Sequence, residues 1–351
     1  MSRFSPTHSR FAIGMLFSLV LAACAGAPTD ATTSGIEPPT APSASVGHEL
    51  NSARHIFHTK EWFAQNAARR RGGGGTGILY HGGSVLQNGT NVVAIYWGSA
   101  TAPVGYKNLP AGTGTGDADG TLIGTFLRNF SSLTDAAASK SYFNINHTYW
   151  GPGGSSTTNL IVPTVTYTGY WSTNGDQGAP IPSASPTDND MIALVNWGIA
   201  NGRIAYDAQT VYAIFTGRGV NLGGGFGTQY CAYHTHGSNL AGTFYYAAMP
   251  YNQQYVSGCT SQFASPNVDV AANSEVNTLA HEIEETTTDD MGNAWYDSRG
   301  YENADKCAWT WGTTATTSNG GVYNLKANGG FYFLVQQNWV NAGSGGCATG
   351  Y

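Results

Sequence analysis

The clearest alternation of apolar and polar positions lies between residues 276 and 286. At about 100° per residue, the apolar residues of this stretch fall on one stripe, formed by Val276, Leu279, Ala280 and Ile283. His281 and Glu285 are one turn apart near the opposite, polar half. The pattern therefore predicts a central amphipathic helix.

Other stretches predict further helices. Apolar residues recur at helical spacing over 120–133, and an acidic cap at Asp188 or Asp190 begins a helix that reaches about Asn201 and ends at Gly202. Near the N-terminus, apolar residues from His48 onwards predict a helix that ends in an arginine triplet at 69–71, before four glycines. The triplet either ends this helix or marks the processing site of a propeptide within residues 48–76.

The remaining apolar runs predict strands. They cover residues 92–97, 160–167, 211–215 and 244–249, with 230–236 between the last two. Residues 322–326 and 331–336 flank Asn328-Gly329 and predict a C-terminal β-hairpin. Strands alternate with helices early and form a hairpin late. We therefore expect one mixed-sheet α/β domain over residues 77–351, with the central helix at its core.

The first residues form an export signal. Arg3 and Arg10 precede an apolar run of about 11 residues, too short for a membrane span, and small residues then lead to Cys24. This pattern predicts a lipoprotein signal over 1–23 and lipidation of Cys24, or else an ordinary secretory signal cleaved near Ala27. Residues 24–47, rich in Ala, Pro, Thr and Ser, follow as a flexible tether. We expect a cell-envelope protein, anchored to the membrane by lipid, or a secreted one.

The cysteines agree with export. Four remain beyond Cys24, and an even number in an exported protein predicts two disulfides, with three pairings open. Proximity in the sequence favours Cys231–Cys259 and Cys307–Cys347. Because no C-x-x-C pair occurs, the spacing of a zinc–thiolate site is absent.

The amino-acid composition and charge limit the kinds of binding partner that we expect. Only 10% of residues are charged, whereas 47 Gly, 20 Tyr and 9 Trp are typical of a strand- and loop-rich exported domain. Loss of residues 1–23 removes two arginines and moves the formal charge from −6 to −8. No basic patch is visible, so nucleic acid is not an expected partner.

The central helix carries the main candidate chemistry. His281 and Glu285 have the spacing of two metal ligands on a helix, and Glu282 beside them can take a proton from water. The zincin H-E-x-x-H helix has the same arrangement of two ligands and a general base, except that Glu285 replaces the second histidine here. The pattern predicts a zincin-like helix with Glu282 as the general base.

Residues after the helix complete the candidate site. Glu302 is the expected third metal ligand, and Asp305 is expected to orient a ligand histidine. Tyr296 or Tyr301 is a candidate donor to a developing oxyanion. Asp289 and Asp290 are alternative oxygen ligands. Zinc is the expected ion, and calcium is the alternative because the set is rich in carboxylates.

Three other interpretations remain open. Glu282, Glu284 and Glu285 also fit the solvated face of an ordinary amphipathic helix. His234 and His236 would point to one side of a strand and could join the same ion. Isolated among glycines, His81 is expected to form only local hydrogen bonds. Serine and cysteine nucleophiles are disfavoured because no G-x-S-x-G motif occurs and the cysteines are expected to be oxidised.

Several short segments resemble one known family. The segments are Leu79–Gly83 with the strand to Trp97, Cys231–His234, Pro266–Val270, Met291–Tyr296 and the end of the chain from Tyr323 to Cys347. Together, over residues 78–347, they resemble the phosphate-induced protein 1, or EXORDIUM-like, family. The resemblance implies an extracellular protein related to cell walls and growth, with no settled enzymatic activity. Plant members usually lack the His-Glu pair that this chain carries at 281–282.

Two functions are therefore expected. The first is an exported, lipid-anchored, metal-dependent hydrolase, most simply a peptidase, that acts through the H-E-x-x-E helix. The second is a non-catalytic envelope protein whose aromatic, Gly-rich surface binds glycans or partner proteins.

Overall fold

The computed structural model describes residues 54–66 and 77–351, all within the compact unit Ala44–Tyr351. Several predictions lie outside the described residues: the signal peptide, the lipidated Cys24, the tether, the arginine triplet and the Gly-rich linker.

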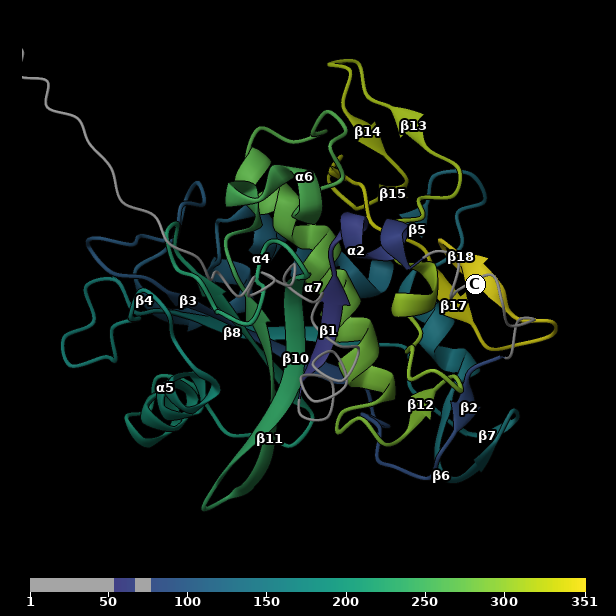
Figure 1. The fold of residues 1–351 in the computed structure, drawn as a ribbon, viewed down its shortest axis with the longest axis horizontal. Coiled ribbons are helices and arrows are strands. Elements are labelled where there is room, and N and C mark those ends of the chain that lie inside the picture. The colour runs from purple at the N-terminus through teal and green to yellow at the C-terminus, as the bar shows by residue number, and fades with distance from the viewer. Residues whose placement is uncertain (1–53, 67–76) are drawn as a thin grey trace, which may run out of the picture. The chain divides into compact units, whose positions relative to one another are not determined.

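One seven-stranded mixed sheet organises this unit (Figure 1). Its four inner strands, β11, β9, β3 and β8, run parallel to one another. β10 and β1 extend one edge and β4 the other, each antiparallel to its neighbour. In sheet order the strands are β1 (His55–His58), β10 (Tyr230–Asn239), β11 (Gly242–Met249), β9 (Thr210–Thr216), β3 (Thr90–Trp97), β8 (Val165–Ser172) and β4 (Gly112–Thr115). The expected mixed α/β class is confirmed.

Helices cover both faces of the sheet because the inner strands are apolar on both sides. Val92, Ala94 and Tyr96 of β3 share a hydrophobic core with α4 (Leu122–Asn129) and α7 (Val270–Thr288). Their neighbours Val93 and Ile95 point to the opposite face and pack with α5 (Asp188–Ala200). Helix α7 is thus enclosed between the sheet and other elements.

The helices begin where short polar side chains cap them. The Thr121 hydroxyl accepts from the Gly124 amide at the start of α4, and the Asp269 carboxylate accepts from the Ala272 amide at the start of α7. Helix α5 is capped by Thr187 in a capping box with Asp190, so the cap lies one residue before Asp188 and three before Asp190, the two residues expected to provide it.

Two predicted elements were wrong in part. The helix expected from His48 to Arg71 is, in its described portion, strand β1 followed by the short helix α2 (Lys60–Gln65). β1 pairs with the edge of β10, and this tertiary pairing overrides the helical periodicity. The strand expected over 160–167 is interrupted around Pro163, which cannot donate to a ladder, so β7 (Thr158–Leu160) ends before β8 begins.

Short ladders fill the rest of the unit. The predicted C-terminal hairpin forms with β15 (Leu325–Lys326) and β16 (Tyr332–Phe333), and β5 (Thr134–Asp135) extends it. The other pairs are β2 (Leu79–Tyr80) with β12 (Trp295–Tyr296), β6 (Trp150–Ser155) with β7, β13 (Ala315–Thr316) with β14 (Val322–Tyr323), and β17 (Asn338–Val340) with β18 (Gly346–Ala348). The short helices are α6 (Val256–Cys259), η1 (Gly116–Ala118), η2 (Phe130–Ser132), η3 (Phe143–Thr148), η4 (Asn252–Gln254) and η5 (Asp305–Cys307).

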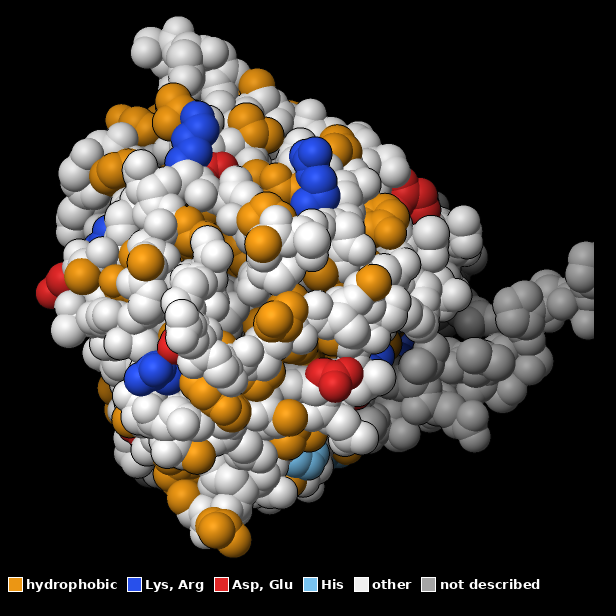
Figure 2. Space-filling view, turned by 90° about the vertical axis from the view of Figure 1, so that its left-hand side faces the viewer, with side chains coloured by type: hydrophobic (Ala, Val, Ile, Leu, Met, Phe, Trp, Pro, Cys, Tyr) orange, Lys and Arg blue, Asp and Glu red, His pale blue; other side chains and the backbone are white. Residues whose placement is uncertain are grey.

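Both predicted disulfides, Cys231–Cys259 and Cys307–Cys347, are present. Disulfides persist in oxidising compartments, so they fit an extracellular or secreted protein. Among the described residues, no helix combines the length and apolar character needed to cross a membrane. On the face shown in Figure 2, the Lys and Arg side chains stand apart from one another.

Candidate metal centre

The polar half of α7 is buried. His281, Glu282, Glu284 and Glu285 are all fully enclosed, because α7 contacts β10, β11, β1 and α4 on different sides. A solvated face would leave these side chains in water, so the interpretation of the three glutamates as an ordinary wet face is wrong. Buried charges need partners or a cation, and the partners of each group therefore decide its role.

His281 and Glu285 contact each other across one helical turn, as the sequence predicts. His281 Nε2 lies 2.9 Å from Glu285 Oε1. Asp305, at the start of η5, places its Oδ1 3.6 Å from the same nitrogen. The backbone amide of Asp305 also donates to Glu285 Oε1 at 2.9 Å. His281, Glu285 and Asp305 can offer one ligand atom each within 4.8 Å of one another.

His234 of β10 is the second imidazole of the cluster. Its Nε2 lies 3.4 Å from the Asp289 carbonyl oxygen, and its Nδ1 lies 3.2 Å from Glu282 Oε2 and 3.7 Å from Glu285 Oε2. A histidine with one nitrogen beside a backbone carbonyl and the other beside carboxylates has the environment typical of a metal ligand.

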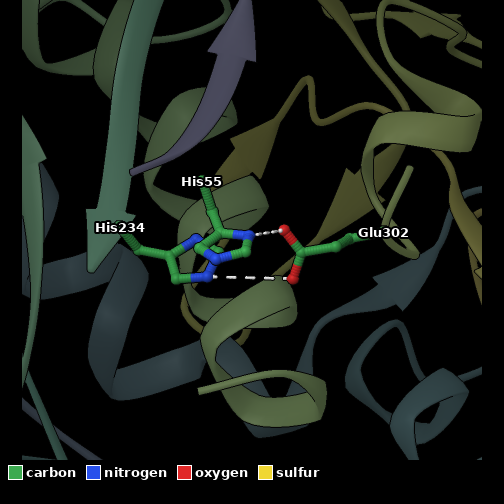
Figure 3. Close-up of side chains that lie close together, drawn as sticks. All are labelled: His55, His234 and Glu302. Carbon is green, nitrogen blue, oxygen red and sulfur yellow. Dashed lines mark hydrogen bonds and ion pairs between the residues drawn. The ribbon is translucent and has the colours of Figure 1, made fainter. Parts of the chain in front are cut away.

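Glu302 meets two imidazoles (Figure 3). Its Oε2 lies 2.7 Å from His55 Nδ1, and its Oε1 lies 3.8 Å from His234 Nε2. The two rings stack with their centroids 4.7 Å apart. Glu302 was expected beside His281, but its closest imidazole contact is with His55.

His55 was missed by sequence reasoning. In the antiparallel pairing of β1 with β10 it lies directly opposite His234, which puts both rings on one face. Phe57, two residues on, points to the same face and stacks on the His281 ring with centroids 3.9 Å apart. The alternation His-Ile-Phe-His at 55–58 was the available signal, but the helical periodicity of the surrounding residues obscured it.

Burial dominates the electrostatics of the cluster. Desolvation lowers the pKa of His55 and of His281 to about 4 and that of His234 well below its ordinary value. Desolvation, with repulsion between neighbouring acids, raises the carboxyl pKa values of Glu282, Glu285 and Glu302 well above the usual range. A divalent cation would reverse this balance, because it stabilises carboxylates and neutral imidazoles together.

Several buried carboxylate oxygens of the cluster make no hydrogen bond to the described residues. Within the described part of the chain, Glu282 Oε1, Glu285 Oε2 and Glu302 Oε1 make no hydrogen bond, although their residues are at most 2% exposed. Buried oxygens in proteins are normally paired. The histidine, glutamate and aspartate donors suit zinc, so the residues present fit an ion of this class.

Other expected site residues lie elsewhere. Tyr296 stacks on His81, with ring centroids 3.7 Å apart, where β12 meets β2, and His81 Nε2 contacts the Tyr296 carbonyl oxygen. Asp289 Oδ1 accepts from the amides that follow α7, and Asp290 accepts from Ser84, so both serve hydrogen bonds of the fold. His236, two residues after His234, is exposed.

Comparison with known families gives one match. Residues 187–349 match the family model described as the phosphate-induced protein 1 conserved region. The family resemblance is confirmed. The matched region contains α7, β10, Glu302 and Asp305, whereas β1 with His55 precedes it. No curated protein and no solved structure matches the chain.

Proposed function

We propose that this member of the phosphate-induced protein 1 family is a secreted, metal-dependent hydrolase of the peptidase type. A lipid anchor at Cys24 would hold it at the cell envelope. The observation that carries the proposal is the buried group His281, Glu285 and Asp305, whose ligand atoms converge within 4.8 Å. Zinc is the ion that this donor set suits best, and calcium is the alternative.

The geometry supports a change in one expected role. Asp305, expected to orient a histidine, is the acid that joins His281 and Glu285 and so completes a set of three ligands. Glu302, the expected third ligand, is held by His55. Three protein ligands leave a coordination position for water, as in catalytic zinc sites. The helix then acts as a zincin-like helix with Glu285 in place of the second histidine.

Glu282 is the group that would take a proton from the attacking water and later release it. Its Oε2 lies 3.2 Å from His234 Nδ1, and its Oε1 has no hydrogen-bond partner among the described residues. A bound divalent ion lowers the pKa of water, and a carboxylate beside it accepts the released proton. Glu282 can pass that proton to a leaving amine, which is the chemistry that amide hydrolysis requires.

The test uses full-length mature protein purified without chelators. Elemental analysis is expected to find about one zinc or similar ion per chain in the wild type. His281→Ala should remove it, and Glu284→Gln should not. Glu284 is the matched control because it is equally buried on the same helix but bonds to the Asn338 amide at 2.6 Å. An ion-free wild type, or equal loss of the ion from both variants, would reject the proposal.

A further inference from the structure

The centre just described is closed. His234 and His281 are fully buried and Glu302 is 2% exposed. A hydrolase must admit its substrate, so one of the elements around the cluster has to move. Among the described histidines and acids that pair within the cluster, His55 of β1 is the most exposed, at 18%, against 9% for Asp305. Access therefore leads through β1.

β1 is a short edge strand that lies over the cluster. Figure 1 shows it in purple beside β10, with α7 next to both. Its inward side chains cover two members of the centre: His55 holds Glu302, and Phe57 lies flat on the His281 ring. It also precedes the region that matches the family model, so it covers the family's conserved part from outside that region.

An extended peptide could replace β1. Main-chain bonds between an edge strand and a peptide are independent of sequence, and they are the usual basis of β-strand addition. The backbone between positions 55 and 57 passes beside His234 and His281, because residue 55 pairs with residue 234 and Phe57 stacks on His281. A substrate in this position would present its amide bonds to the candidate centre.

We infer that β1 is an internal mimic of the substrate: the edge of β10 is the docking strand for an extended polypeptide, and β1 must leave it before the centre can act. This inference rests on the proposed hydrolase function. Displacement of β1 would also release Glu302 from His55. The substrate side chain at the position of Phe57 would lie between the rings of His281 and Trp309, so a large apolar or aromatic residue is favoured there.

Two side chains, Arg54 and Lys60, anchor β1 and α2 through hydrogen bonds to residues outside the cluster; Lys60 Nζ also lies 5.5 Å from the centroid of the Trp309 ring. Arg54 Nε bonds to Asp188 at 2.7 Å, and its guanidinium lies over the Tyr233 ring. Lys60 Nζ donates to the Thr260 carbonyl oxygen at 2.5 Å. Arg203 offers a matched control, because it pairs with Asp176 at 2.7 Å and lies over Trp197 far from β1 in the sequence.

The experiment compares the mature wild type, Arg54→Ala/Lys60→Ala and Arg203→Ala. The probe is a fluorescent synthetic peptide with the sequence of residues 54–66, and binding is measured by anisotropy. We expect the double variant to bind the probe about fivefold or more tightly than the wild type, because the Arg54–Asp188 ion pair and the Lys60–Thr260 hydrogen bond no longer hold β1 and α2 in place. The gain stays modest because partly exposed contacts of this kind contribute little each. Arg203→Ala should behave as the wild type. Hydrogen exchange at the β10 amides should be faster in the double variant and slow again when the peptide is added.

Peptide variants test the substrate preference without altering the protein. A Phe57→Ala peptide should bind at least tenfold more weakly than the parent peptide, and a Glu61→Ala peptide should bind equally, because Glu61 is exposed. Equal binding of the parent and Phe57→Ala peptides, or a double variant whose β10 amides stay as protected as in the wild type, would overturn the inference. Both readouts are independent of metal content, so failure of the proposed function would be seen separately as an ion-free protein.

Discussion

Helix α7 carries two kinds of buried glutamate. Glu275 and Glu282 are two turns apart, which places them on the same side of the helix, and both are fully buried. The Glu275 oxygens accept from the backbone amide and the side-chain amide of Asn252, at 2.6 and 3.0 Å. Glu282 instead faces His234, and its second oxygen has no partner among the described residues.

This difference separates a structural acid from a candidate catalytic one. Each Glu275 oxygen accepts a hydrogen bond from an Asn252 amide, so this carboxyl is held by neutral donors. Near Glu282, imidazoles and further acids face one another across distances of 2.7 to 3.8 Å. Glu282, Glu285 and Glu302 each keep an oxygen with no hydrogen bond to the described residues, as does Glu284 on the same helix. The chemistry of the partners, and not burial itself, therefore supports the proposed metal site beside Glu282.

Glu282→Gln gives the largest expected effect. The amide cannot accept a proton, so we expect peptide hydrolysis to fall by about 10²–10⁴-fold with the metal content unchanged. The assay follows cleavage of an unfolded, dye-labelled protein. It compares the Arg54→Ala/Lys60→Ala variant with the same variant that also carries Glu282→Gln. Full activity in the glutamine variant would remove Glu282 from the mechanism.

Glu285→Gln should weaken metal binding. It removes a charged ligand that contacts His281 at 2.9 Å, so we expect the affinity for zinc to fall by about 100-fold. Competition with a chromophoric chelator reports the affinity. Glu284→Gln, on the same helix, is expected to leave it unchanged; if both glutamines weaken binding equally, the contrast between the two kinds of glutamate fails.

Glu275→Met should lower stability and spare the metal. The substitution leaves the Asn252 backbone amide without an acceptor and removes one of the two acceptors of its side-chain amide, which still donates to Thr278 Oγ1. Each buried donor hydrogen left unpaired costs about 1–3 kcal/mol. We expect a loss of about 3 kcal/mol in the free energy of unfolding, measured in urea on the disulfide-bonded protein. A variant as stable as the wild type would show that these hydrogen bonds contribute little.

The smallest expected effect is a pH dependence. Burial raises the pKa of Glu275 well above its usual range, so the native state keeps a proton that the unfolded state releases above about pH 4.3. This group's contribution to stability is therefore present at low pH and is lost as the pH rises towards the raised pKa. From pH 4 to pH 7, the wild type should therefore lose stability relative to the Glu275→Gln variant, which has no titrating group at this position. If the difference in unfolding free energy between the two proteins stays constant over this range, the raised pKa assigned to Glu275 is wrong.

The sequence predicted those parts of the site that are local. His281, Glu282 and Glu285 could be read from helical spacing, and Asp305 from the segment that follows. His55 could not be found this way, because its role depends on an antiparallel pairing across 179 positions of sequence, between His55 and His234. The burial of the polar half of α7 was likewise invisible, since periodicity shows which residues share a face but not what covers that face.

The elements of the fold differ in the same way, between local and long-range signals. Long apolar strands and capped helices were predictable because their signals lie within the segment. β1 was not predictable, because four residues at a sheet edge take their conformation from β10 and not from their own propensity.

Anomalous diffraction at the zinc absorption edge, from crystals grown with zinc, tests the central claim most directly. The account predicts a peak bounded by His281 Nε2, a Glu285 carboxylate oxygen and Asp305 Oδ1, with Glu282 adjacent but not bound. A map with no peak in this cluster, or with the ion bound by Glu282 itself, would contradict it.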